Sequence, residues 1–282
     1  MTELALGAIG AVVHLSRLRL GQQTALQTMM LVALLTLLWA AIKALAGRPV
    51  AWATRVYGVL HPYTQLLYDR VRSVPMTMLY VVTWSVTSVI QQGTPANIQD
   101  VVDQYNSTNL TLLAHNPVRV LFSSAFIIDD HAWGFIGYVL VYVTVVAAVE
   151  RAIGWRRTLI IWVSSHVLGS LATAVTEALL VHYDLLSNSV RFASDVGVSY
   201  VMVGACGAYL LFGSHRSRWL VGIGLLAGVG LPLALSHTVW DVGHAYATLI
   251  GLGTGALALR GAQIQPEPPW RAALTAARAI PQ

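Results

Sequence analysis

Charged residues are scarce in this chain. Asp, Glu, Lys and Arg make up 10% of its 282 residues, whereas about a quarter of the residues of a soluble domain are charged. Hydrophobic residues make up 56%, and the mean hydropathy is +0.64. Such a composition excludes an ordinary soluble domain. It predicts an all-α, polytopic membrane protein.

Cysteine and lysine are almost absent as well. The single cysteine, Cys206, lies within an apolar run, so no internal disulfide can form. Of the 17 Lys and Arg residues only Lys43 is a lysine, and the pI is about 9.6. In a membrane protein such cations indicate topology first, so we expect no nucleic-acid partner. The nine histidines show no metal-ligand spacing, so we expect neither a metal nor a cofactor.

Several apolar stretches are long enough, or nearly so, to cross a hydrocarbon core of ~30 Å. Cations gather in alternate connections, which the positive-inside rule places in the cytoplasm. The acidic loop 93–133 is therefore expected outside and the C-terminus in the cytoplasm, as in a multi-pass protein of a cell membrane, here a bacterial inner membrane. The expected spans are 25–46, 76–92, 134–154, 158–181, 196–213, 219–235 and 240–259.

This pattern divides the chain into three regions. Residues 1–73 form an N-terminal extension with one candidate transmembrane helix and a basic cytoplasmic connector, and residues 74–261 form a transmembrane domain. Residues 262–282 are proline-containing and are expected to be a flexible cytoplasmic tail. The topology of 1–46 stays open, because a single span there places two arginines outside.

A serine and a histidine lie at matching depths in two of the expected spans. Ser199 is a few residues below the outer end of 196–213, roughly 5–8 Å deep at about 1.5 Å per residue. His244 is a similar number of residues below the outer end of 240–259. Glycines on both helices permit close contact in lipid, so we expect the two side chains to face each other. These glycines are Gly197, Gly204, Gly207, Gly243, Gly251 and Gly255.

Such a pair can perform acyl transfer. A neutral imidazole within reach of a hydroxyl takes its proton and later returns it to the leaving group. Asp241 and Asp195 lie within one turn of His244 and Ser199, respectively, so either carboxylate can orient the histidine or attract water. A simpler explanation is that the serine bonds to its own helix and that the glycines serve packing alone. Ionisable groups at membrane depth favour a functional role.

The residues around this pair resemble the rhomboid family of intramembrane serine proteases. Gly197-Val-Ser199 is similar to the family's Gly-x-Ser-Gly helix, and His244-Ala-Tyr-Ala-Thr-Leu-Ile-Gly251 is similar to its His-x-x-Gly-x-x-x-Gly helix. The Asp-Val-Gly-Val-Ser and Asp-Val-Gly-His phrases resemble those of arginine-rich, rhomboid-like proteins of actinobacteria. Residues 116–126 and 149–154 resemble, in the same order, the lead into the second core helix and its Glu-x-x-x-Gly ending.

The resemblance implies a rhomboid-like six-helix transmembrane core in 74–261, with an extra hydrophobic helix before it. It also implies that Ser199 is the nucleophile and His244 the general base of a protease that cleaves transmembrane segments. Gly197, Asp195 and Asp241 would support or orient the pair. The implied partners are transmembrane substrates or clients and the lipid bilayer.

Three positions depart from the family's pattern. Tyr200 replaces the glycine after the serine, and Tyr138 and Gly134 stand where an oxyanion asparagine and a histidine are usual. One oxyanion donor contributes ~2.7–4 kcal/mol. The alternative hypothesis is therefore a catalytically inactive rhomboid-fold protein that binds transmembrane helices or lipids. His131 is a candidate substitute for the missing oxyanion donor. A transporter is a third and weaker hypothesis, because the sequence shows no inverted repeat.

Overall fold

The computed structural model describes residues 23–128, 133–264 and 272–275. These residues form helices and connections, and no strand occurs among them. The stretches Thr24–Ala46, Gly134–Ile153, Trp155–His182 and His215–Leu235 are long and apolar enough to cross a membrane, and the bent pair Ala51–Arg72 with Pro75–Gln92 can supply a fifth span. The predicted all-α, polytopic architecture is confirmed.

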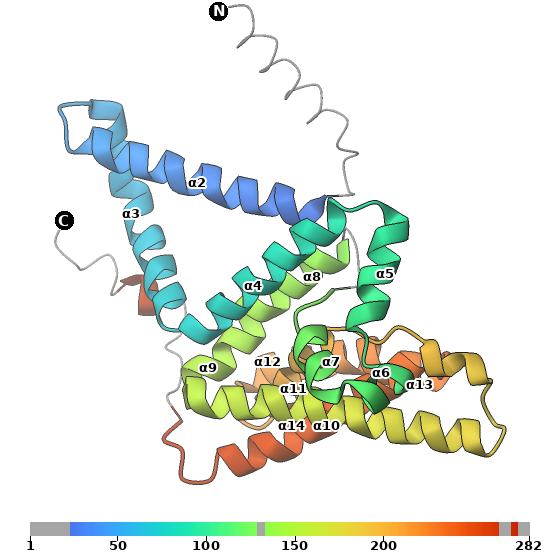
Figure 1. Ribbon diagram of the computed structural model, residues 1–282. Coiled ribbons are helices and arrows are strands. Elements are labelled where there is room, and N and C mark those ends of the chain that lie inside the picture. Colours follow the sequence, from blue (N-terminus) through green and yellow to red (C-terminus); the bar gives the residue numbers. More distant parts are fainter. Residues whose placement is uncertain (1–22, 129–132, 265–271, 276–282) are drawn as a thin grey trace, which may run out of the picture.

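Helices follow one another with short connections (Figure 1). The first part of the chain contains α2 (Thr24–Ala46), α3 (Ala51–Arg72), α4 (Pro75–Gln92), α5 (Ala96–Asn106), α6 (Leu110–His115) and α7 (Pro117–Ser124). The second part contains α8 (Trp133–Val141), the π-helical turn η1 (Tyr142–Val146), α9 (Ala147–Ile153), α10 (Trp155–His182), the 3-10 turn η2 (Asn188–Phe192), α11 (Ser199–Tyr209), α12 (His215–Leu225), the π-helical turn η3 (Leu226–Gly230), α13 (Leu231–Leu235) and α14 (Val239–Ala258).

Two helices, α2 and α3, project from the helical bundle (Figure 1). The segment 47–74, expected as a basic connector, is largely the helix α3, and α3 meets α4 at an angle of 88°. The chain can turn there because Pro75 is favoured at the first position of a helix. Few side chains of α2 are buried, so its leucines are left to face hydrocarbon.

A buried carboxylate on α9 fixes the start of α4. Glu150 accepts hydrogen bonds from the Met76 N–H at 3.0 Å and from the Thr77 N–H and hydroxyl at 2.7 and 2.6 Å. These are amides of the first turn of α4, which have no acceptor within their own helix. Gly154 ends α9 with φ +81°, a conformation that favours glycine and lets the chain reverse into α10. The Glu-x-x-x-Gly segment thus joins three helices.

An aromatic cluster forms the centre of the core. Trp84 of α4 packs edge to face on Phe135 of α8, and Tyr142 of η1 lies between Trp84 and Trp162 of α10. The Tyr142 hydroxyl donates to the carbonyl of Val198 at 2.8 Å. The core therefore reaches the residue that precedes α11.

The long segment between α4 and α8 is held against the bundle by polar contacts. Gln91 Nε2 donates to Asp103 Oδ1 at 2.7 Å, which holds α5 beside the end of α4. The Ser124 carbonyl at the end of α7 accepts the Gly197 N–H at 3.0 Å. This segment is therefore fixed to the stretch that leads into α11.

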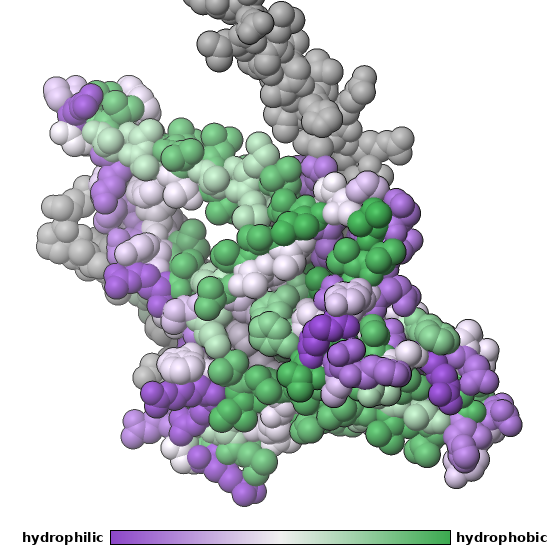
Figure 2. Space-filling model, viewed as in Figure 1, coloured by the Kyte–Doolittle hydropathy of each residue, from purple (hydrophilic) through white to green (hydrophobic). Residues whose placement is uncertain are grey.

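Surface hydropathy follows the expected membrane arrangement. Figure 2 shows apolar side chains along α4 and the middle of α10, and hydrophilic side chains near both ends of α10. A helix with an apolar middle and polar ends is typical of a membrane span.

Candidate active site

Helices α11 and α14 approach so closely that only glycine fits at several positions between them. A Cβ added at Gly251 would lie 2.1 Å from the Gly204 carbonyl oxygen and 2.4 Å from Gly204 Cα. One added at Gly255 would lie 2.7 Å from Ala208 Cβ. The prediction that glycines bring these two helices together is confirmed.

Ser199 is the first residue of α11 and is 6% exposed. Gly197 has φ +157°, and a Cβ there would lie 2.7 Å from Ser199 Oγ, so glycine leaves room for the hydroxyl. Thr173 and Thr248 bond back to carbonyls four residues earlier in their helices. The Ser199 hydroxyl makes no hydrogen bond within the described residues. A serine bonded to its own helix is therefore not the explanation for Ser199.

His244 lies in the second turn of α14. The ring of Tyr200, the residue after Ser199, meets the His244 ring edge to face with centroids 5.4 Å apart. The Tyr200 hydroxyl lies against Gly243, where a Cβ would be 1.6 Å from it. Ser199 and His244 thus occupy neighbouring parts of two contacting helices.

The Asp195 carboxylate, a candidate orienting group, contacts Tyr200. Asp195 Oδ2 accepts the Thr108 hydroxyl at 3.0 Å and the Tyr200 hydroxyl at 3.2 Å, and the Asp195 N–H donates to Ser107 Oγ at 2.7 Å. Burial raises the pKa of the Asp195 carboxyl. Asp195 therefore couples the segment before α6 to the side chain that touches His244.

Asp241, the other candidate orienting carboxylate, stabilises the start of α14. Its Oδ2 accepts the Thr238 N–H at 2.9 Å and the Thr238 hydroxyl at 2.6 Å, which completes a capping box. Asp241 also lies close enough to His244 for the two to interact electrostatically. Its carboxylate thus fixes the turn that leads to His244. The negative charge of the carboxylate also favours a protonated imidazole.

A family model for rhomboid-like proteins matches residues 69–264, well over half of the chain. The chain belongs to the rhomboid-like family. The match confirms the resemblance noted from the serine and histidine segments, and it covers α4 to α14 while leaving α2 outside. No curated protein and no solved structure matches this rhomboid-like protein.

The start of α11 in the rhomboid-like protein offers backbone donors beside the serine. The first N–H groups of a helix have no acceptor within it, and the first backbone bond here runs from the Met202 N–H to the Val198 carbonyl at 3.1 Å. The N–H groups of Ser199, Tyr200 and Val201 donate to no other described residue. The sequence did not predict these free N–H groups, because the expected span began at residue 196. They are available beside Ser199 only because the helix starts at the serine itself.

The family's usual side chains are absent from its two oxyanion positions. Gly134 has no side-chain donor to offer, and Tyr138 packs against the hydrophobic core of the rhomboid-like protein. His131, the candidate substitute, lies outside the described residues. The backbone of α11 is thus the source of donors adjacent to Ser199.

Proposed function

We propose that this rhomboid-like protein is an intramembrane serine protease that cleaves transmembrane segments of other membrane proteins. Ser199 acts as the nucleophile and His244 as the general base. One observation carries the proposal: the serine begins α11, with a hydroxyl that bonds to no described residue and with unpaired backbone N–H groups next to it. A nucleophile and oxyanion donors are thereby combined at one helix start.

The chemistry follows from these positions. His244 takes the proton of the Ser199 hydroxyl while Oγ forms a bond to the carbonyl carbon of the substrate. The resulting oxyanion accepts hydrogen bonds from the first N–H groups of α11, where the helix dipole also favours negative charge. His244 then gives the proton to the leaving amine. Water, deprotonated by His244, then attacks the acyl carbon; as the bond from that carbon to Oγ breaks, His244 returns the proton to Ser199 and the carboxyl product leaves.

Three further residues have supporting roles in this proposal. Gly197 keeps the space beside Ser199 Oγ open. Asp241 caps the helix that carries His244 and favours its protonated form during the reaction. Asp195 holds the hydroxyl of Tyr200, whose ring limits the rotation of the imidazole.

The membrane arrangement belongs to the same proposal. The segment 93–133 lies outside and the C-terminus in the cytoplasm of a bacterial inner membrane, with 74–261 as the rhomboid-like domain. Residues 1–73 add one membrane helix, and 262–282 form a cytoplasmic tail. Cleavage then takes place near the outer face, because Ser199 and His244 lie close to the outer ends of their helices.

A fluorophosphonate probe tests the proposal, because it labels a serine only when that serine is activated. We expect the purified protein in detergent to be labelled at Ser199. Labelling is lost in Ser199→Ala and falls at least ~10²-fold in His244→Ala, the lower range of general-base contributions. Ser73→Ala, an exposed serine at the end of α3, serves as the control and keeps full labelling. Absence of labelling in the wild type, in detergent and in vesicles, refutes the protease proposal.

A non-catalytic protein that binds transmembrane helices is the second candidate, and Tyr200 favours it. Its buried ring and hydroxyl occupy the space beside Gly243 that a smaller residue would leave open for substrate. In that case the wild type is not labelled but retains apolar helical peptides in a pull-down from mixed micelles. Labelling at Ser199 excludes this candidate.

A further inference from the structure

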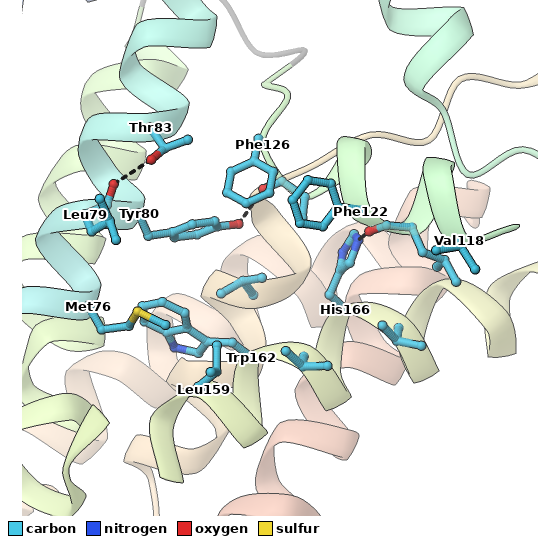
Figure 3. Close-up of a pocket in the computed structure, with 15 residues that line it drawn as sticks. Met76, Leu79, Tyr80, Thr83, Val118, Phe122, Phe126, Leu159, Trp162 and His166 are labelled. Atoms are coloured by element: carbon cyan, nitrogen blue, oxygen red, sulfur yellow. Dashed lines mark hydrogen bonds between the residues drawn. The ribbon is translucent and has the colours of Figure 1, made fainter. Parts of the chain in front are cut away.

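An apolar pocket of about 610 Å³ lies between α4, α7 and α10, with Val201 of α11 also in its lining (Figure 3). Its inner wall contains the buried side chains of Tyr80 and Trp162. Its rim contains the exposed side chains of Phe122 and Val163. The pocket therefore leads from the apolar surface of the bundle to its aromatic core, and its size is that of a ligand-binding pocket.

The hydroxyl groups that line this pocket are already bonded within the protein. The Tyr80 hydroxyl donates to the carbonyl of Ala125, and the Thr83 hydroxyl donates to the carbonyl one turn earlier at 2.8 Å. His166 Nε2 donates to the carbonyl of Leu121 at 2.9 Å. Two other ring nitrogens of lining residues, His166 Nδ1 and Trp162 Nε1, bond to no described residue, but both are buried within the protein and are not exposed to the pocket. An occupant therefore meets almost no exposed donor or acceptor in the described lining. The pocket therefore suits a group without polar atoms.

We propose that the pocket holds an acyl chain of a bilayer phospholipid. Val163 lies on a membrane-spanning helix, so the rim of the pocket borders the hydrocarbon of the bilayer. Each contact between apolar atoms contributes only ~0.1–0.2 kcal/mol. In an empty pocket, however, every atom of the wall lacks such contacts on the side that faces the pocket. An acyl chain that enters the pocket restores these contacts and forms no unpaired polar group.

The size of the pocket distinguishes an acyl chain from a membrane helix. A helix about 10 Å wide fills the 610 Å³ within a length of about 8 Å, or roughly five residues. A continuous transmembrane helix can therefore place only a fragment in it. A single hydrocarbon chain is narrow enough to enter the hollow, which the rings of Tyr80 and Trp162 border in Figure 3.

Photocrosslinking locates the chain without reference to enzymatic activity. The full chain is placed in phosphatidylcholine vesicles that contain a lipid with a diazirine on its acyl chain, irradiated, digested and mapped by mass spectrometry. We expect crosslinks at pocket residues of α4, α7 and α10 at least fivefold more frequent than at the exposed leucines of α2, which report contact with bulk lipid. Val163→Trp, which fills the rim, abolishes this excess.

Val175→Trp is the matched control, because Val175 lies on the same helix, is 59% exposed against 53% for Val163, and does not line the pocket. It should keep the wild-type pattern. Equal crosslinking at the pocket and at α2, or loss of the excess in both tryptophan variants, overturns the proposal. Displacement of the lipid by an apolar helical peptide also overturns it and assigns the pocket to a protein partner.

Discussion

The contact between α11 and α14 predicts a large effect of a single methyl group. In Gly251→Ala the new Cβ would lie 2.1, 2.4 and 2.5 Å from the carbonyl oxygen, Cα and carbonyl carbon of Gly204. Apolar atoms prefer separations of ~3.5–4.0 Å, so the helices must part by roughly 1 Å. Overpacking costs typically ~1–3 kcal/mol. We expect the upper end, about 3 kcal/mol, because backbone atoms cannot rotate out of the way.

Gly253→Ala is the control for this change. Gly253 lies on the same helix, and nothing lies within 4 Å of a Cβ added there. Alanine is favoured over glycine by up to ~1 kcal/mol within a helix. We therefore expect Gly253→Ala to leave the free energy of unfolding unchanged or to raise it by at most about 1 kcal/mol.

The free energies are measured by reversible unfolding in mixed micelles with increasing sodium dodecyl sulfate, followed by tryptophan fluorescence. The expected difference between the two variants is about 3–4 kcal/mol. Equal stabilities within about 0.5 kcal/mol, the usual range of surface substitutions, would show that α11 and α14 are not in the contact described here.

Two further predictions concern buried carboxylates. Glu150→Gln should lower the free energy of unfolding by ~1.5–3 kcal/mol, because the hydrogen bonds from the start of α4 lose a charged acceptor. Asp69→Asn, at an exposed site, is the control. Equal effects of the two substitutions in the same micelle assay contradict the role of Glu150 in holding the start of α4. Burial raises the pKa of Asp195 in the folded protein above its ordinary value of 3.8. Its contribution to stability is thus fully present below 3.8 and is lost as the pH rises through the folded pKa, so the wild type should lose stability relative to Asp195→Asn over that interval. A difference between the two proteins that does not change with pH argues against a buried, titrating Asp195.

Several features followed from local patterns. The lipid-facing helices were predictable because a backbone in hydrocarbon must satisfy its own hydrogen bonds, so a long apolar run is a helix. The spacing of Gly251 and Gly255 predicted a close helix contact for the same local reason, since small residues one turn apart form a flat stripe.

Other features depended on contacts between distant segments. Glu150 bonds to Thr77 across 73 residues, and Asp195 bonds to Thr108 across 87. No periodicity reports which buried donor a carboxylate will meet, so the contact between Asp195 and the Tyr200 hydroxyl was not predicted. The helical character of 47–74 was also missed, because its arginines obscured its pattern of partly buried residues.

The sequence by itself determined that the chain is an all-helical membrane protein of the rhomboid-like kind, and it singled out Ser199 and His244. Both conclusions depend on residue types at short spacings, which the solvent and the helix repeat translate directly into structure. Only the tertiary structure decided where α11 begins, which amides are left unpaired beside Ser199, and that Tyr200 lies against His244. The start of α11, its unpaired amides and the contact of Tyr200 with His244 all lie where several helices meet. Each therefore depends on which side chains the packing of those helices brings together.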